Sequence, residues 1–376
     1  MQVSEILPSL DGLAPYLHEF QKGLLAHTAS SLPLLTRLTQ YYVTQPSKRL
    51  RPCLIFLMCQ ATNGLGVDWA VKVREAQGFA TNDCTNSPEI LPSQIRLAQV
   101  IEMMHVASLM HDDVIDNAET RRGAPSAPTV FGNHSAVLGG DFVVSRAMAL
   151  TATLGSPEVM ILVSKAFCTL VEGELLQSGG IQNHSGPADA FRFDADFLYC
   201  TFRVPPDDIA LATMWEDYIC KTYMKTACLF SCALQCSVIL GGAGNEECWR
   251  KMALLYGHRL GMAFQLVDDL LDFTGDPGKL GKPANADLSL GIATAPVLFA
   301  LEEDESIREF VLRRFGEPGD VQKTIERVKN TGALRRTREL AELYADKARQ
   351  TLSILPESAA KCALSDLAAA ILVRQN

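Results

Sequence analysis

Two groups of aspartates have the residue type and the spacing of a metal site. Both follow the pattern Asp-Asp-x-x-Asp, and they comprise Asp112, Asp113 and Asp116, and Asp268, Asp269 and Asp272. Each group lies in an apolar stretch, residues 105–115 for the first and 262–273 for the second. Carboxylates are rare in apolar stretches unless something positive meets them. The two clusters together therefore predict cation binding, and they suggest two facing walls of one metal-filled pocket.

The spacing within each cluster predicts which carboxylates carry the metal. A helix turns by about 100° per residue, so positions i and i+4 share a face and the middle aspartate is rotated away. Two neighbouring carboxylates raise each other's pKa unless a cation bridges them. A site made of carboxylates, without cysteine, suits hard cations and Mg²⁺ first. The predicted metal ligands are Asp112, Asp116, Asp268 and Asp272.

Basic residues near the clusters predict phosphate binding, because Mg²⁺ usually shares its coordination shell with substrate phosphates. Arg121 and Arg122 follow the first cluster, Lys48-Arg49-Leu50-Arg51 precedes it, and Lys225 and Lys282 lie further along. Two basic sets and a metal could hold two diphosphates. A single Asp-Asp-x-x-Asp is more often a helix start or a solvated face, and a lone His105 is more often a core histidine. The repetition of the whole arrangement favours the site.

Composition excludes some classes of function. The net charge of −9 argues against a nucleic-acid partner, which demands an excess of Lys and Arg. The 11 scattered cysteines do not form a disulfide framework and indicate a reducing compartment. The first 36 residues contain one Lys and three acidic residues, unlike a transit peptide, so we expect a cytoplasmic protein. A mitochondrial location stays open if the chain is trimmed. The uncharged stretch 226–245 reads as a buried core helix, so no integral membrane protein is expected.

The elements that position these residues are predicted to be helices. Apolar residues recur at helical spacing, as in Leu97, Val100, Ile101 and Met104, and no stretch shows sustained alternation. We therefore expect an all-α fold of ten or more helices, as one domain over residues 1–376. Residues 1–33 are interpreted as an N-terminal extension, and residues 179–215 as a surface insertion.

Four segments resemble the trans-prenyl diphosphate synthases. They are residues 105–141 and 261–300 around the clusters, the KRLRP sequence at 48–52, and KTYMKTACLF at 221–230. The chain is most similar to the fungal long-chain members that make the side chain of ubiquinone. The resemblance implies an isoprenoid-synthase fold around a central cavity, usually a homodimer. It also implies that isopentenyl diphosphate is condensed with an allylic diphosphate in the presence of Mg²⁺.

The same resemblance implies roles for individual residues. The allylic diphosphate would bind through Mg²⁺ to Asp112, Asp116 and Asp268, with Asp269 and Asp272 in support. The residues that would hold isopentenyl diphosphate are Lys48, Arg51, His105 and Arg122. Those that would hold the allylic diphosphate are Arg121, Lys225, Thr226, Gln265 and Lys282. The catalytic set would be Asp112, Asp116, Arg121, Lys225 and Asp268, because metal and cations draw electron density from the leaving diphosphate.

Product length is predicted to depend on the helix before Asp112. Ala107 and Ser108 are small and would leave room for a growing tail, whereas Met103 and Met104 lie one turn deeper and could form a floor. A long-chain product and a short-chain product (geranyl, farnesyl or geranylgeranyl diphosphate) both stay open. Two alternatives of another class are a terpene cyclase, which would not need the KRLRP group, and a non-catalytic partner subunit, which would tend to lose the clusters.

Overall fold

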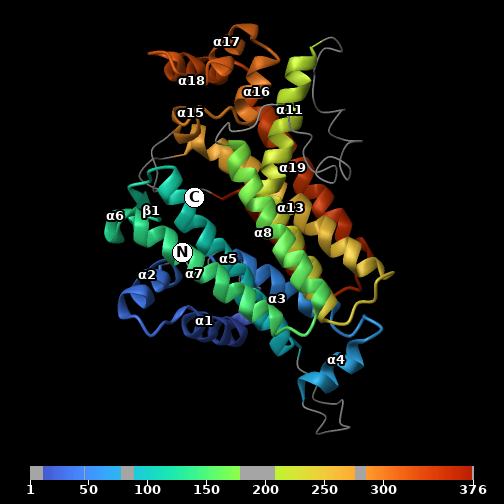
Figure 1. The fold of residues 1–376 in the computed structure, drawn as a ribbon. Helices are drawn as coiled ribbons and strands as arrows, with labels where there is room; N and C mark the ends of the chain where they lie inside the picture. The colour runs from blue at the N-terminus through green and yellow to red at the C-terminus, as the bar shows by residue number, and fades with distance from the viewer. Residues whose placement is uncertain (1–11, 46, 78–88, 178–207, 276–284, 375–376) are drawn as a thin grey trace. The chain divides into compact units, whose positions relative to one another are not determined.

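The computed structural model of the chain describes residues 12–45, 47–77, 89–177, 208–275 and 285–374 (Figure 1). More than ten α-helices account for most of these residues. The strands within these ranges are β1 (Thr120–Arg121) and β2 (Ala124–Pro125), which pair as a short antiparallel hairpin. The prediction of an all-α fold is confirmed.

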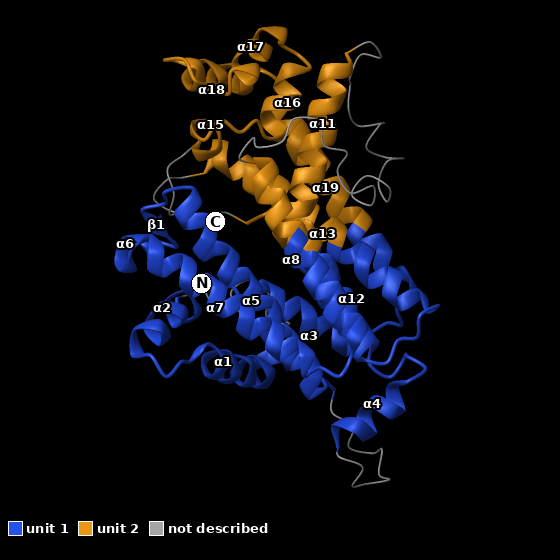
Figure 2. Ribbon diagram, viewed as in Figure 1, with its two compact units in different colours: residues 1–168, 229–257, 348–368 blue, residues 169–228, 258–347, 369–376 orange. Residues whose placement is uncertain are grey.

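The contacts divide the chain into two compact units, each built from three segments (Figure 2). Unit 1 comprises Met1–Cys168, Leu229–Gly257 and Ala348–Ala368, and unit 2 comprises Thr169–Cys228, His258–Lys347 and Ala369–Asn376. Because the segments interleave, α8 (Pro157–Gln177), α13 (Cys248–Thr274) and α19 (Ala333–Thr351) each run from one unit into the other. The single domain expected from the sequence stays a prediction.

Helix α5 (Pro92–Ile115) is the central element of unit 1. It packs against α1 (Ala14–Thr28), α3 (Leu50–Thr62) and α7 (Asn133–Ala152) (Figure 1). A helix enclosed by others must be apolar around its circumference, and most side chains of α5 are buried. The packing around α5 holds this helix in place, and it thereby positions the first aspartate cluster at its C-terminal end.

The remaining helices of unit 1 surround this core. They are α2 (Pro33–Thr44), α4 (Trp69–Ala76), α6 (Ala127–Phe131), α12 (Cys228–Leu240, from its second residue on) and most of α20 (Ala359–Leu372). Pro33 and Pro92 occupy the first position of α2 and α5, where the missing N–H costs nothing. Helix α2 ends at Thr44, just before Gln45-Pro46, and the residue before a proline is disfavoured in a helix.

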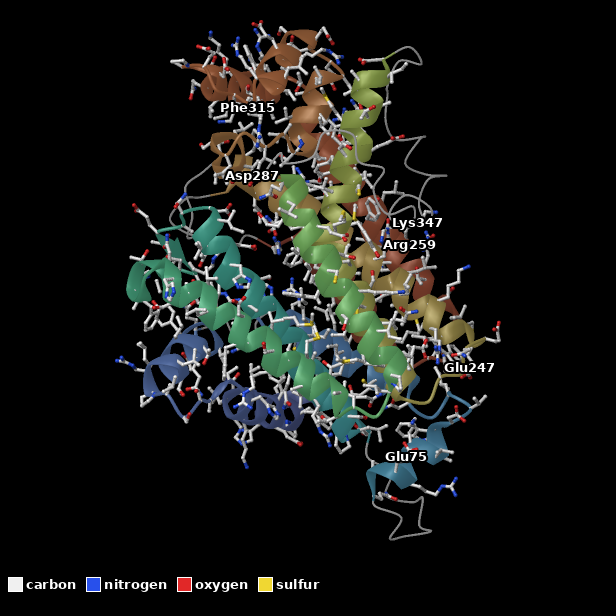
Figure 3. The ribbon with its side chains drawn as sticks, viewed as in Figure 1. Glu75, Glu247, Arg259, Asp287, Phe315 and Lys347 are labelled. Atoms are coloured by element: carbon white, nitrogen blue, oxygen red, sulfur yellow. The ribbon has the colours of Figure 1, made fainter. Side chains whose placement is uncertain are left out.

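Unit 2 contains α11 (Ile209–Thr222) and the π-helical turn η4 (Tyr223–Ala227), followed later by α15 (Ala286–Ser289), α16 (Ala295–Leu301), α17 (Arg308–Leu312) and α18 (Asp320–Asn330). Every side chain of α16 is buried. The Trp215 ring packs on Phe299 at 4.6 Å between centroids, and its Nε1 donates to Glu302 at 2.9 Å. Figure 3 labels Arg259, whose guanidinium donates to the Lys347 carbonyl at 3.2 Å and so links α13 to α19.

The structure describes part of the two segments that the sequence sets apart, the N-terminal extension and the surface insertion, and both stay predictions. Residues 14–28, within the predicted N-terminal extension, form α1. This helix packs on α5 and α3 inside unit 1, and its Phe20 and Leu24 are buried. The predicted surface insertion at 179–215 lies largely outside the described residues. Its last part is the start of α11, where Asp208 accepts the N–H of Leu211 at 3.0 Å and Trp215 is buried. The Asp208 cap and the buried apolar side chains of α11 stabilise this helix.

One helical run among the described residues, Ile209–Leu240, is long and apolar enough to cross a membrane. Within its most apolar window, 83% of the residues are buried inside the structure. That burial is typical of a core helix, which is how the sequence analysis interprets the stretch 226–245.

Candidate functional site

The first aspartate cluster ends helix α5 in unit 1. Asp112 and Asp113 lie in the last turn, and Asp116 is the C-cap, with its N–H bonded to the Asp112 carbonyl at 2.8 Å. The side chains of Asp112 and Asp116 are partly exposed, whereas Asp113 is fully buried. The middle aspartate is thus turned into the protein, as its place on the helix predicts.

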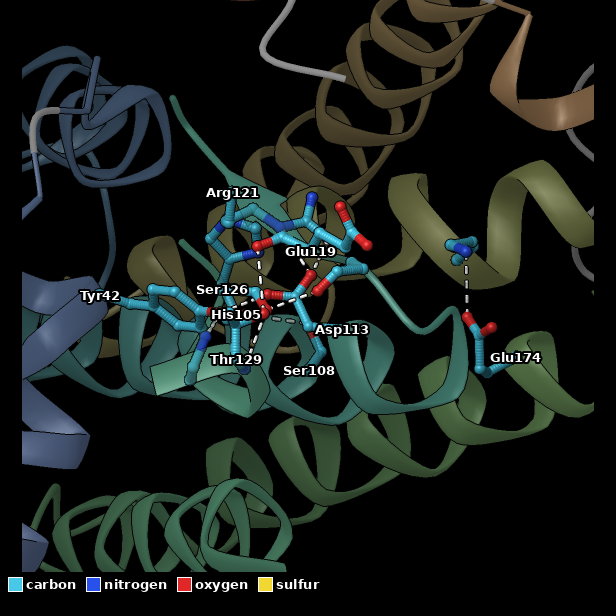
Figure 4. A network of polar contacts seen from close by, with 12 residues as sticks. Tyr42, His105, Ser108, Asp113, Glu119, Arg121, Ser126, Thr129 and Glu174 are labelled. Carbon is cyan, nitrogen blue, oxygen red and sulfur yellow. Dashed lines mark hydrogen bonds and ion pairs between the residues drawn. The ribbon is translucent and has the colours of Figure 1, made fainter. Parts of the chain in front are cut away.

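Asp113 is held by two partners, and neither is a metal (Figure 4). Its Oδ1 accepts from Arg121, from Nε at 2.8 Å and from Nη2. Its Oδ2 accepts from the hydroxyl of Tyr42, which comes from α2. A buried carboxylate is stable when charge and hydrogen bonds compensate it on both oxygens.

The hairpin of β1 and β2 carries the two arginines that follow the first cluster. Thr120 pairs with Pro125, and Arg121 pairs with Ala124. Arg122 and Gly123 occupy the turn with φ of 54° and 76°, a left-handed pair that suits glycine at its second position. The two-residue turn therefore fixes Arg121 in the paired strand, with Arg122 next to it.

His105 lies two helical turns before Asp112 and is surrounded by positive charge. Burial lowers the pKa of His105 well below its usual value, and the charges of Arg51, Arg122, Arg121 and Arg49 lower it further. Since all four act on one imidazole, unit 1 gathers them around it. A neutral histidine among several guanidinium groups is suited to a polyanionic ligand.

The segment that precedes α3 brings further basic residues to unit 1. Lys48 lies in this segment and is half-buried, and the Arg51 guanidinium stacks on the Phe230 ring at 4.8 Å from its centroid. Arg49 is the N-cap of α3 in a left-handed conformation, φ 47°. It pairs with the buried Glu102 at 2.6 Å, and so ties the start of α3 to α5.

The residues predicted to control product length lie on the same helix. Met103, Met104 and Ala107 are fully buried. Ser108 is partly exposed, and its hydroxyl donates to the His105 carbonyl at 2.9 Å. The small residues therefore lie between the buried methionines and the aspartate cluster, and their role in product length stays a prediction.

The second cluster lies on α13 in unit 2 and is buried more deeply. Asp268 is 39% exposed, whereas Asp269 and Asp272 are buried. The carboxylate of Asp272 accepts the backbone N–H groups of Ala286 at 3.2 Å and Asp287 at 3.3 Å, at the start of α15. Lys282, predicted to bind diphosphate, lies outside the described residues.

Asp269 has neutral hydrogen-bond partners. The Tyr218 hydroxyl donates to it at 2.6 Å, and the Gln265 amide donates at 3.0 Å. Burial raises the pKa of Asp269 to about 6, and the charge of Asp287, labelled in Figure 3, raises it as well. Burial also lowers the pKa of the nearby Lys221, against the opposing effect of Asp269.

Thr226 and Lys225 are presented by the π-helical turn η4, a feature that is frequent at functional sites. The Thr226 hydroxyl donates to Gln265 at 2.7 Å, so Thr226, Gln265 and Asp269 form one chain of hydrogen bonds. Gly261 allows α13 to pack closely against η4, because a Cβ at this position would lie 2.6 Å from the Cα of Ala227. The Lys225 ammonium pairs with Glu174 on α8 at 3.0 Å (Figure 4).

A cation from the end of the described chain also reaches the second cluster. The Arg374 guanidinium forms an ion pair with Asp268. It also stacks on the Phe264 ring, with 3.9 Å from its central carbon to the ring centroid. Burial lowers the pKa of Arg374 to about 10. In this structure Asp268 is therefore neutralised by a side chain of the protein.

The donors of each unit suit a hard divalent cation. Asp112 and Asp116 in unit 1 offer partly exposed carboxylate oxygens, and Asp268 in unit 2 offers another. Among the described residues, no three His, Cys, Asp or Glu side chains gather as a complete metal cage. Mg²⁺ does not need one, because it binds through one or two carboxylates and takes waters and phosphates for the rest.

Sequence reasoning missed several residues of these arrangements. They are Tyr42, Glu102, Tyr218, Lys221 and Arg374. Because Asp113 and Asp269 lie in apolar helices, each is expected to need a hydrogen-bond donor or a cation inside the protein. No pattern identifies the partners, because Tyr42 lies 71 residues from Asp113 and Tyr218 lies 51 residues from Asp269.

Known proteins of similar sequence share one activity. The hexaprenyl pyrophosphate synthase, mitochondrial, of Saccharomyces cerevisiae is 38% identical over 429 residues, which cover 96% of this chain and 89% of the relative. The decaprenyl-diphosphate synthase subunit 1 of Schizosaccharomyces pombe is 37% identical over 370 residues, with the same two shares. The names of these relatives identify the chain as a prenyltransferase with long-chain relatives.

Solved structures agree with the fold. The decaprenyl diphosphate synthase from Rhodobacter capsulatus matches with a TM-score of 0.77 at 29% identity, over 98% of this chain and 99% of the other. The geranylgeranyl pyrophosphate synthetase from Pyrococcus horikoshii matches with a TM-score of 0.71 at 27% identity, over 99% of both chains. The polyprenyl synthetase family model matches residues 32–328, and the chain belongs to the polyprenyl synthetase family.

Proposed function

We propose that the protein condenses isopentenyl diphosphate with an allylic diphosphate in an Mg²⁺-dependent reaction that gives a linear, long-chain prenyl diphosphate. One observation carries the proposal: Arg51, Arg121 and Arg122 surround His105 on the helix that ends in Asp112. Several cations near partly exposed carboxylates suit a diphosphate that is bound partly by side chains and partly through a metal.

In this proposal Asp112, Asp116 and Asp268 hold Mg²⁺, with Asp272 as a fourth ligand. Mg²⁺, when bound, supplies a Lewis acid that polarises the oxygens of the leaving diphosphate. Arg121 and Lys225 hold that diphosphate and compensate the charge that develops as the carbon–oxygen bond breaks. Thr226 and Gln265 orient it with their hydrogen-bonding groups.

The second substrate, isopentenyl diphosphate, is assigned to Lys48, Arg51, His105 and Arg122. The low pKa of His105 keeps its imidazole neutral near pH 7, so one ring nitrogen donates a hydrogen bond and the other can accept one. Arginine suits the bidentate grip of phosphate oxygens, and Lys48 adds a point charge. The double bond of the bound substrate then attacks the allylic carbon, whose bond to the diphosphate oxygen breaks, and the resulting cation loses a proton to the released diphosphate.

Incubation of the purified protein with Mg²⁺, isopentenyl diphosphate and allylic primers from dimethylallyl to geranylgeranyl diphosphate tests the proposal. We expect release of diphosphate and a lengthened product by mass spectrometry. The absence of elongation with every primer would contradict it for the isolated chain. Release of a hydrocarbon from the allylic primer alone would indicate a cyclase instead.

The long product is supported by the small residues Ala107 and Ser108 above the buried Met103 and Met104. It is also supported by the relatives, which are named hexaprenyl, decaprenyl and solanesyl synthases. Ala107→Phe is expected to shorten the product by several isoprene units, while Met104→Ala leaves it equal or longer. A product of four units or fewer from the unaltered protein would favour the short-chain alternative.

The cytoplasmic location expected from the sequence finds no support in the comparisons, because fungal relatives carry the word mitochondrial in their names. We therefore place the enzyme in mitochondria, which fractionation of the source cells would test. A homodimer is the proposed assembly. Since one relative is named subunit 1, light scattering of the purified chain is needed to show whether it assembles alone.

A further inference from the structure

The buried carboxylate of Asp113 is a junction between helix α5 and the hairpin that carries Arg121. Asp113 has no exposed surface, so its charge must be matched inside the protein. Nε and Nη2 of Arg121 donate to one carboxylate oxygen, and the Tyr42 hydroxyl donates to the other. Of the five N–H donors of the guanidinium, two are used in this way, which leaves three for a ligand.

Tyr42 joins three elements through one oxygen atom (Figure 4). It lies on α2 and is 1% exposed. Its hydroxyl donates to Asp113 on α5 and accepts the N–H of Ala127, the first residue of α6, at 2.7 Å. Burial and the hydrogen bond to Asp113 raise the pKa of Tyr42, so the phenol stays a neutral donor in the working pH range.

The segment between α5 and α6 is anchored at both ends around this junction. The N–H of Ala118 donates to the Asp113 carbonyl at 2.9 Å, and the N–H of Ser126 donates to the Glu119 carbonyl at 2.9 Å. The Ser126 hydroxyl donates to the Ala118 carbonyl at 2.5 Å. These bonds fix the backbone of the hairpin. They leave the long side chain of Arg121, which is 30% exposed, to be oriented by Asp113.

We propose that Tyr42 is a positioning residue for Arg121, and that it acts by locking the carboxylate of Asp113 in the orientation that aims the guanidinium at the allylic diphosphate. This inference rests on the proposed function of Arg121. Without the phenolic hydroxyl, one oxygen of Asp113 loses its donor, and the carboxylate gains freedom to rotate. Arg121 must then be ordered at the moment of binding, which weakens affinity more than it slows the chemical step.

The experiment compares Tyr42→Phe with Tyr256→Phe. Tyr256 is a matched control, because its phenol is also buried in unit 1 and donates one hydrogen bond, to the Leu364 carbonyl at 2.7 Å. We expect Tyr42→Phe to raise the KM for the allylic diphosphate about tenfold, with kcat changed less than about threefold. We expect Tyr256→Phe to keep the KM of the unaltered protein.

An unchanged KM in Tyr42→Phe would overturn the proposal, and so would an equal rise in both variants, which would mark a general structural effect. A double-mutant cycle adds a second readout. In an Arg121→Gln background, Tyr42→Phe should have little further effect on KM, because the group that it positions is gone. Additive losses would show that Tyr42 acts independently of Arg121.

A binding arm separates this proposal from the proposed function. Calorimetry with inorganic diphosphate and Mg²⁺ should show weaker binding to Tyr42→Phe, by about tenfold, than to Tyr256→Phe or the unaltered protein. If the unaltered protein elongates no primer, the proposed function fails, but the calorimetric comparison still tests Tyr42. Equal diphosphate affinity in the two variants would overturn the positioning role, whatever the enzyme catalyses.

Discussion

The two aspartate clusters share a sequence pattern but are neutralised in different ways. In the first, an arginine pairs with the middle residue, as Arg121 does with Asp113. In the second, the middle residue Asp269 is bonded to Tyr218 and Gln265, and the arginine Arg374 pairs instead with Asp268, a predicted metal ligand. Each middle aspartate accepts a hydrogen bond from a tyrosine hydroxyl. Among the described residues, Asp113 also has a positively charged group at hydrogen-bonding distance, whereas Asp269 does not.

This difference shows that a repeated motif does not imply a repeated electrostatic design. In the first cluster the guanidinium of Arg121 lies against the buried carboxyl group of Asp113. The second surrounds Asp269 with neutral hydrogen-bond donors, and its burial, together with the charge of Asp287, raises the pKa of Asp269 to about 6. The first cluster is therefore built around an internal ion pair, whereas in the second Asp269 responds to pH near 6 and Asp268 pairs with Arg374.

The largest expected effect concerns the outer aspartates, where the two clusters should behave alike. Asp112→Asn and Asp268→Asn are each expected to reduce kcat/KM by about a hundredfold or more, because each removes a charged Mg²⁺ ligand. Steady-state kinetics over a range of Mg²⁺ concentrations would measure the loss. Near-normal turnover in either variant would exclude that residue as a ligand.

The middle aspartates should differ in their contribution to stability. Asp113→Asn leaves Arg121 facing a neutral amide and is expected to cost about 2–4 kcal/mol. Asp269→Asn replaces a carboxyl that has neutral partners and should cost about 1 kcal/mol. Urea unfolding of the two variants measures both costs. Equal shifts in the midpoint would show that the counter-charge on Asp113 does not matter.

The second cluster should also give a pH dependence that can be isolated. The folded pKa of Asp269, about 6, exceeds the unfolded value near 4, so the folded state holds a proton that the unfolded state releases. The stabilising contribution of this proton is present below about pH 4 and is lost as the pH rises to about 6. The loss amounts to at most about 3 kcal/mol. Metal-free protein should therefore lose more stability over this window than Asp269→Asn, and parallel curves would contradict the assignment.

The smallest expected effect comes from Arg374. Because its guanidinium pairs with Asp268, Arg374→Gln should strengthen Mg²⁺ binding by about two- to fivefold, since a partly exposed pair contributes about 1 kcal/mol or less. Arg374→Lys, which keeps the charge, serves as the control. Calorimetric titration of both variants with Mg²⁺ alone makes the comparison, and weaker binding by Arg374→Gln would refute the competition.

The sequence was sufficient for the features that depend on local periodicity. The helical spacing in α5 predicts that Asp113 turns away from Asp112 and Asp116, and the structure buries it. The helical spacing of Leu97, Val100, Ile101 and Met104 likewise predicts a helix there, and all four residues lie in α5. The sequence could not identify Tyr42 or Tyr218, because a hydrogen bond between distant segments leaves no periodic trace. Nor could it place Arg49, whose left-handed backbone is stabilised by a tertiary ion pair with Glu102.

Each unit is assembled from three segments of the chain, and this has a consequence for biosynthesis. Unit 1 needs residues 348–368 to be complete, although its first segment ends at Cys168. While the ribosome makes the intervening residues, the apolar faces that await α12 and the end segment stay uncovered. Domains that fold late in synthesis expose such surface to aggregation. We expect the nascent chain to depend on chaperones until residues 348–368 have emerged from the ribosome.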